Sequence, residues 1–329
     1  MRRWNLVIGL AISVTCLVLA LAGIEWHRAG EALRRADWRY LLPAGAALVG
    51  YLLARAYRWR ILLGPRVGLG DAFSVTNIGY LISNVLPFRL GDPARAVAIG
   101  LGGKVKIGAA LSTVLVERVL DMLAVVLLLA VTVPFVGEAG WTLRAGAVGG
   151  AMGLIVLALL LSLAAYPKHG RRIVHWVLGR LPWMDQERWL GLYDDLLDGL
   201  AALRSTRGVA ALSSWSAITW VFTVGHYFAM LRAFIDRPSV IEASFLTCAT
   251  GLGMAIPSSP GAMGVFHSIA RYALQLPFGV PAETAVVVAF ASHAFQYTFM
   301  CFFGLVGLVQ QNLSLGQLRS EAIATLAKE

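Results

Sequence analysis

Long apolar stretches separated by short charged ones run along this chain. Six of them are long enough to cross a bilayer, whose hydrocarbon core takes about 20 apolar residues of helix. They lie at residues 4–24, 40–63, 107–133, 142–166, 209–231 and 282–309. Two further apolar segments, residues 71–101 and 239–276, are interrupted by prolines and glycines. The pattern therefore predicts an all-α polytopic membrane protein with six spanning helices and two broken or re-entrant helical segments.

The composition agrees with this prediction. Of the 329 residues, 58% are hydrophobic and only 14% are charged, whereas about 25% are charged in soluble domains. The net charge of +10 comes from basic residues between the apolar stretches. This placement indicates that they set the membrane topology and contact anionic lipid headgroups, and it argues against nucleic acid as a partner. Cys16, Cys248 and Cys301 lie in apolar stretches without metal-ligand spacing, and we expect neither a metal site nor a cofactor.

The basic residues also predict the orientation of the chain in a cell membrane. Arginines and lysines mark cytoplasmic ends of spans, which places both termini in the cytoplasm. Residues 1–134 and 141–311 then contain the same order of elements in opposite orientation, with the broken segments 71–101 and 239–276 at corresponding places. This is the pattern of an inverted-topology repeat, which many secondary transporters contain.

A long polar stretch, residues 167–207, interrupts the second half. Its apolar side chains recur at helical spacing, among them Trp189, Leu196 and Leu203. We predict a cytoplasmic amphipathic connector that either lies on the membrane or covers the helix bundle. Residues 312–329 are predicted to form a polar tail.

The first broken segment carries charges where hydrocarbon is expected. Arg89, Asp92 and Arg95 surround its interruption, and Asp92 with Pro93 predicts a new helix start, with Asp92 as N-cap. Arg89 beside that helix N-terminus is a candidate ligand for a phosphate or carboxylate. The alternative is that Arg89 and Arg95 are topological anchors at the membrane surface, paired with acids or headgroups.

A second group of charges lies in the span at residues 107–133. Glu117 and Asp121 are four residues apart and share a helical face, with Arg118 between them. Arginines of the other apolar segments are their available partners, and these are Arg55, Arg58, Arg89 and Arg95. The cluster is either a structural salt-bridge network or a site for substrate or proton coupling.

The second broken segment is polar but uncharged. Ser258 and Ser259 offer hydroxyls, Gly261 permits close backbone approach, and His267 follows in the next helix. A lone histidine here is more often a packing residue than a proton carrier. The sequence contains no catalytic triad order, CxxC pair, Walker loop or HExxH motif, so we do not expect an enzyme.

Taken together, these motifs resemble the flippase-like membrane domain found at the N-terminus of lysylphosphatidylglycerol synthases. The likeness is carried by residues 55–59, Asn84, residues 86–92, Arg95, residues 117–121, residues 256–261 and Gly264. It implies movement of a lipid between leaflets, with the broken helices forming the site. We expect a stand-alone member without the soluble aminoacyl-transfer domain. Position 267 commonly holds a glutamate in similar proteins and holds histidine here.

The sequence thus predicts a lipid transporter or flippase that binds an anionic phospholipid or a polyprenyl-linked lipid. The predicted binding residues are Arg55, Arg58, Asn84, Arg89, Asp92, Arg95, Glu117, Arg118, Asp121, Ser258, Ser259, Gly261 and His267. The alternative is a non-transporting membrane partner of a lipid-synthesis enzyme or glycosyltransferase, in which the charged cluster has a structural role.

Overall fold

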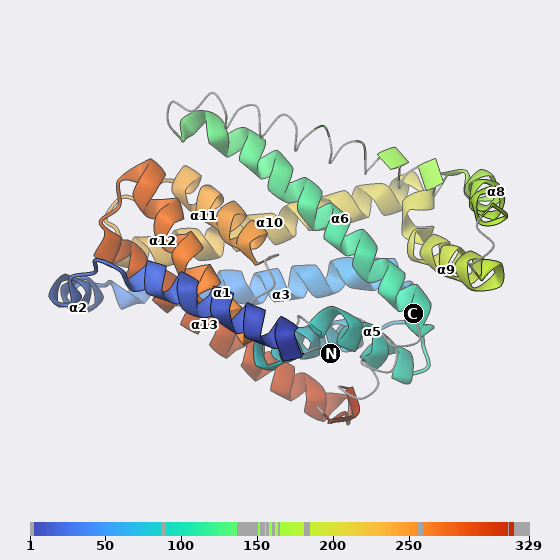
Figure 1. Ribbon diagram of the computed structural model, residues 1–329, viewed down its shortest axis with the longest axis horizontal. Coiled ribbons are helices and arrows are strands. Elements are labelled where there is room, and N and C mark those ends of the chain that lie inside the picture. Colours follow the sequence, from blue (N-terminus) through green and yellow to red (C-terminus); the bar gives the residue numbers. More distant parts are fainter. Residues whose placement is uncertain are drawn as a thin grey trace.

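The computed structural model describes residues 3–86, 90–136, 165–180, 185–254, 259–314 and 316–318, with isolated positions between 151 and 163. The described part of the chain contains helices and no strand (Figure 1), which confirms the all-α prediction. The first half contains α1 (Arg3–Leu21), α2 (Trp26–Arg34), η1 (Trp38–Tyr40), α3 (Leu41–Leu63), α4 (Leu69–Val85), α5 (Gly91–Leu101), α6 (Ile107–Thr132) and η3 (Val133–Phe135). The second contains α8 (Pro167–Leu178), α9 (Gln186–Gly199), η4 (Ala201–Arg204), α10 (Thr206–Phe234), α11 (Val240–Gly253), η5 (Pro260–Ala262), α12 (Val265–Phe278) and α13 (Ala282–Gln310).

The long helices α3 and α10 pack side by side along the molecule and run antiparallel (Figure 1). Tyr57 stacks on Trp215 with ring centroids 4.3 Å apart. Further along, His226 Nδ1 donates to the carbonyl of Ala44 at 3.0 Å. Residue numbers therefore rise along α10 as they fall along α3.

Each interrupted apolar segment folds as a helical hairpin, α4 against α5 and α11 against α12. In the first hairpin, a Cβ atom on Gly91 would overlap the carbonyl of Gly79, so only glycine permits this approach. Helix α13 packs against α4, where Gly304 and Gly307 touch the α4 backbone. Helix α6 packs against α11. Each hairpin is thus held by a long helix from the other half of the chain.

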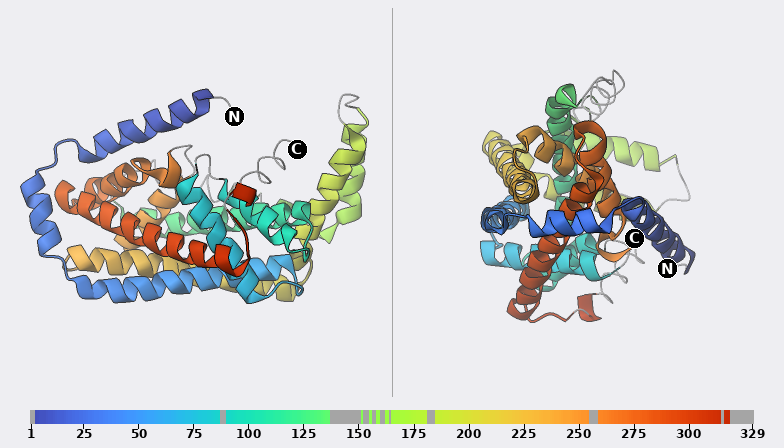
Figure 2. Two further views of the ribbon diagram at one scale, coloured as in Figure 1. Left: turned by 90° about the horizontal axis from the view of Figure 1, so that it is seen from below. Right: turned by 90° about the vertical axis from the view of Figure 1, so that its left-hand side faces the viewer.

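The predicted connector contains two helices, α8 and α9, at the end of the bundle opposite α2 (Figure 2). Tyr193, Leu197 and Leu203 are buried in one core with Val114 of α6 and Leu212 of α10. Of the two places expected for the amphipathic helix, the structure shows it covering the bundle, because α9 packs against α6 and η4 packs against α10.

Two described helices, α10 and α13, are long and apolar enough to cross a membrane. Helices α1 and α2, with a bend of 81° between them, form either one broken span, which would be the third, or a re-entrant loop. Helices α3 and α6 have spanning length, 23 and 26 residues, but carry charged side chains within it. The predicted span at residues 142–166 lies almost entirely outside the described residues.

Candidate functional site

A buried carboxylate on α6 joins three helices. The side chain of Glu117 is fully buried, and Nη2 of Arg55 from α3 and of Arg95 from α5 lie 2.6 Å from its two oxygens. Arg58, also fully buried, approaches the same carboxylate at 3.3 Å. An unpaired charge at this depth would be very costly, so Glu117 and the three arginines stabilise one another.

Asp121 extends the cluster by one turn of α6. Its Oδ1 accepts from Arg58 Nη2 at 2.6 Å, and its Oδ2 lies 3.1 Å from Arg55 Nη2. Glu117 and Asp121 share a helical face, as their spacing predicts. The acids and arginines that the sequence placed on separate segments are brought together.

Asp92 has a different role from the expected one. Helix α5 begins at Gly91, with Leu90 at the N-cap position and no side-chain cap. The Asp92 carboxylate instead accepts from Arg118 Nε and Nη2 at 2.8 and 2.7 Å, a bidentate pair. The prediction of Asp92 as N-cap is therefore wrong, because a guanidinium that matches both carboxylate oxygens outcompetes a single backbone N–H.

Aromatic side chains position the arginines. The Arg95 guanidinium lies 4.6 Å from the ring centroid of Trp59, a cation–π geometry. Arg55 Nη1 donates to the hydroxyl of Tyr51, which lies 2.6 Å from the hydroxyl of Tyr80. The arginine positions are therefore set by packing as well as by charge.

We define the arginine cluster as Arg55, Arg58, Arg95 and Arg118 with Asp92, Glu117 and Asp121. Four guanidinium groups face three carboxylates, so the cluster carries one excess positive charge. Most of it is buried, but the side chains of Arg118 and Asp92 are 43% and 34% exposed. The cluster is thus able to attract an anion, and the Arg118–Asp92 pair is its accessible part.

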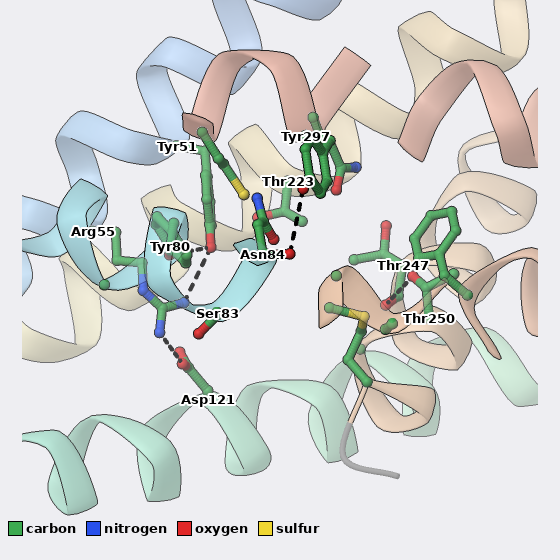
Figure 3. Close-up of a pocket in the computed structure, with 18 of the residues that line it drawn as sticks. Tyr51, Arg55, Tyr80, Ser83, Asn84, Asp121, Thr223, Thr247, Thr250 and Tyr297 are labelled. Carbon is green, nitrogen blue, oxygen red and sulfur yellow. Dashed lines mark hydrogen bonds and ion pairs between the residues drawn. The ribbon is translucent and has the colours of Figure 1, made fainter. Parts of the chain in front are cut away.

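The arginine cluster opens onto a cavity of about 440 Å³. Arg55, Asp121 and Tyr80 lie on one side of it, Thr247 and Thr250 on the opposite side, in Figure 3. Figure 3 also shows Ser83, Asn84 and Tyr297 lining the cavity between these sides. The cavity therefore connects charged side chains of the first half with neutral hydroxyls of the second.

The two helix interruptions meet at this cavity. Near the end of α4, the carbonyl of Asn84 accepts from Tyr297 of α13 at 3.3 Å. Gly261 in η5, with φ +64°, lies beside the same carbonyl, and a Cβ there would come within 3.0 Å of the Tyr297 ring. Asn84, Ser259 and Gly261 all line the cavity.

His267 is not among the residues that line the cavity. Its Nδ1 accepts from the backbone N–H of Gly264 at 3.2 Å, and its Nε2 lies 3.2 Å from Nδ1 of His293. Its ring stacks on Phe290 with centroids 3.9 Å apart. His267 therefore caps α12 and packs the second hairpin.

Two of the predicted binding residues, Arg89 and Ser258, lie outside the described residues. Conversely, the cavity contains residues that sequence reasoning did not select, among them Tyr51, Tyr80, Thr247 and Thr250. Threonines repeated at helical spacing in apolar segments were the signal available for the last two.

The buried charges, interrupted helices and long apolar helices together define a polytopic helical membrane protein with an internal polar site. Residues 6–304 match the lysylphosphatidylglycerol synthase TM region family, and the chain belongs to this family. This confirms the resemblance drawn from its motifs.

Two relatives extend this finding. The chain is 24% identical over 348 residues to the glycosyltransferase AglD of Haloferax volcanii, with 95% of this chain and 55% of the relative covered. It thus spans about half the length of that relative. It is 25% identical over 283 residues to a UPF0104 membrane protein of Methanothermobacter thermautotrophicus, with 80% and 82% covered. No solved structure matches the chain significantly.

Proposed function

We propose that this protein is a lipid transporter or flippase that moves an anionic phospholipid or polyprenyl-linked lipid between leaflets. The observation that carries the proposal is the arginine cluster, which has an excess positive charge and opens onto a cavity among apolar helices. Ionisable groups at membrane depth usually mark a substrate pathway. Nothing in the family name or the relatives' names assigns catalysis to this cavity, and transport is proposed in place of enzyme activity.

Headgroup binding would start at the accessible pair. Two phosphate oxygens that replace the Asp92 carboxylate keep the two N–H groups of Arg118 satisfied, because phosphate and carboxylate accept the same bidentate fork. Arg55, already ordered by Tyr51 and Asp121, lines the same cavity. The lipid tails would remain in the bilayer.

The packing of the helices supports the proposed inverted-topology repeat. When α3 is exchanged with α10, α4 with α11, α5 with α12 and α6 with α13, the main helix contacts map onto one another: α4–α13 onto α11–α6, and α5–α6 onto α12–α13. The corresponding helices α3 and α10 run antiparallel, as inversion requires. We propose repeats at residues 1–134 and 141–311 with six spans, and alternating access by movement between them.

The test uses purified protein in phosphatidylcholine vesicles with tail-labelled phosphatidylglycerol, whose exposure in the outer leaflet is followed by quenching. We expect faster movement than in protein-free vesicles. R118Q removes the excess charge and is expected to slow movement about tenfold, the loss of about one charged hydrogen-bonded contact. D92N adds a net positive charge, and the double variant D92N/R118Q restores the wild-type net charge.

This series of variants separates the effect of net charge on lipid movement from the effect of a structural change. Movement that follows net charge, with the double variant faster than R118Q alone, supports the proposal. Equal rates in vesicles with and without protein would refute transport. A double variant slower than either single variant would assign the pair a structural role.

A second candidate function is that of a membrane partner for a glycosyltransferase or lipid-synthesis enzyme. It is favoured by the relative named a glycosyltransferase, of which 45% lies outside the matched region. Helix α9 packs its apolar face against α6, but Trp189, at the start of that face, is exposed and is available to a partner. Loss of complex formation in W189A with unchanged lipid movement would support this function.

A further inference from the structure

The second half of the chain presents hydrogen-bond acceptors to the cavity. Four threonines on α10 and α11 line it, and each hydroxyl donates its proton to the carbonyl four residues earlier in the same helix. These threonines are Thr219, Thr223, Thr247 and Thr250. A hydroxyl has one proton, so each oxygen has only lone pairs left to offer, and that of Thr250 also lies 3.3 Å from the hydroxyl of Tyr227.

His226 adds an acceptor of the same kind. Its Nδ1 donates to the Ala44 carbonyl, and a carbonyl only accepts, so Nδ1 carries the proton in the neutral ring. Nε2 is then an acceptor, and it has no hydrogen-bond partner among the described residues although His226 is only 1% exposed. A buried polar atom without a partner is costly, which indicates that a ligand supplies the missing donor. We call these five residues the acceptor wall.

A bare phosphodiester has no proton to donate, so it cannot satisfy the acceptor wall. Two kinds of headgroup can, a hydroxylated one and an ammonium. Among the described residues lining the cavity, the only carboxylates are Asp92 and Asp121, and both are paired with arginines. An ammonium at the acceptor wall would thus be buried without a counter-charge from the protein.

Trp220 also favours a hydroxylated headgroup over an ammonium. Trp220 lines the same cavity, and its buried indole N–H has no acceptor among the described residues. An ammonium only donates, whereas a hydroxyl both donates and accepts. A hydroxylated headgroup therefore satisfies both the acceptor wall and Trp220.

We infer that the acceptor wall binds the hydroxyl groups of an uncharged polyol or sugar headgroup, attached to the phosphate that the arginine cluster holds. The inference rests on the proposed function for the phosphate and names the substrate class of the same cavity. It commits to a headgroup with several hydroxyls and a single negative charge.

The experiment measures lipid binding to the purified full-length chain by native mass spectrometry, independently of transport. The probes have identical acyl chains: phosphatidylinositol, phosphatidylmethanol, which has the same phosphodiester charge without hydroxyls, and phosphatidylethanolamine, which carries an ammonium. We expect the wild-type protein to bind phosphatidylinositol at least about tenfold more tightly than the other two, the effect of two neutral hydrogen bonds.

The double variant T247V/T250V keeps side-chain shape and removes two acceptors. We expect it to lose about tenfold in phosphatidylinositol binding and to bind phosphatidylmethanol as the wild type does. T298V is the matched control, because Thr298 donates to the Ala294 carbonyl in the same way but does not line this cavity. T298V should bind both phosphatidylinositol and phosphatidylmethanol as the wild type does.

The inference is overturned if the wild type binds phosphatidylmethanol as tightly as phosphatidylinositol, if it prefers phosphatidylethanolamine, or if T298V weakens phosphatidylinositol as much as T247V/T250V. The variant R118Q distinguishes failure of this inference from failure of the proposed function. If R118Q weakens the binding of all anionic probes, and the wild type does not prefer hydroxylated headgroups, the proposed function stands and the acceptor wall is rejected. Absence of any arginine-dependent binding would reject both.

Discussion

The two helical hairpins, α4–α5 and α11–α12, have the same plan and opposite chemistry. The first is tied to α6 by ion pairs of Asp92 and Arg95. The second contributes no charged side chain among the described residues lining the cavity, and the buried Arg271 of α12 donates away from it, to backbone carbonyls at the end of α1. The two hairpins therefore share a plan and divide the chemistry of the site.

This difference shows what each half contributes. Buried charges attract an anion over distance and require strict pairing, because each unpaired charge is costly. Neutral acceptors add selectivity by hydrogen bonding without creating a further charge in the membrane. A charged headgroup portion is thus expected on one side and a neutral portion on the other.

The largest loss of stability is expected when the arginine cluster of the first half is disrupted. E117Q leaves Arg55 and Arg95 without their closest buried counter-charge, and we expect a loss of about 3–5 kcal/mol in the free energy of unfolding. Thermal unfolding in detergent measures it. E31Q, in the exposed charge pairs of α2, is the control and should change stability by less than about 1 kcal/mol. Equal effects would show that Glu117 is not the centre of a pairing network.

The next effect concerns how firmly the first hairpin is held. In G304A the new Cβ would lie 2.5 Å from Leu81 Cβ and 2.7 Å from the Asn77 carbonyl oxygen, so α13 must move away from α4. Overpacking of this kind costs about 1–3 kcal/mol, read from the shift of the thermal unfolding midpoint. G30A is the control, since nothing lies within 4 Å of that position. A G304A protein as stable as G30A would mean that α4 and α13 are not rigidly docked.

A smaller effect is expected in the neutral half. H267L removes the hydrogen bond to the Gly264 N–H and the contact with His293, and we expect a loss of about 1–2 kcal/mol because the groups are uncharged. The same unfolding assay applies. A loss as large as that of E117Q would contradict the distinction drawn between the two hairpins.

The smallest effect is expected in α9, which belongs to the predicted cytoplasmic connector. Burial raises the pKa of Asp195. The nearby carboxylates of Asp198 and Asp194 also raise this pKa, whereas Lys106 lowers it by less than burial raises it. A raised pKa in the folded state adds stability below the unfolded value, about 3.9, and this is lost as the pH rises through the folded value. D195N is therefore expected to strengthen the docking of α9 at pH 7 and not below pH 3.9.

Hydrogen exchange of the α9 amides at the two pH values measures this docking. E187Q, on the exposed side of α9, controls for the removal of a negative charge from the helix. Faster exchange in D195N at pH 7 would contradict the assignment.

Much of the site was predictable because charges in apolar segments are conspicuous. Glu117, Asp121, Arg55 and Arg58 attract notice in the sequence, since hydrocarbon does not tolerate them unpaired. The role of Asp92 was not predictable. A local rule assigns it to the N-cap, whereas Arg118, 26 residues away, takes its carboxylate in the fold. His267 likewise was selected for its chemistry and found as a cap.

The sequence by itself determined the all-helical membrane class, the two interrupted segments and the need to pair the buried charges, because these follow from hydropathy, from proline and glycine, and from the cost of charge in hydrocarbon. Only the tertiary structure decided which arginine meets which acid and that the two interruptions share one cavity. It also decided that the threonines of α10 and α11 face that cavity with their protons already donated. Such contacts join residues far apart in the chain, and their geometry is set by helix packing that no local pattern encodes.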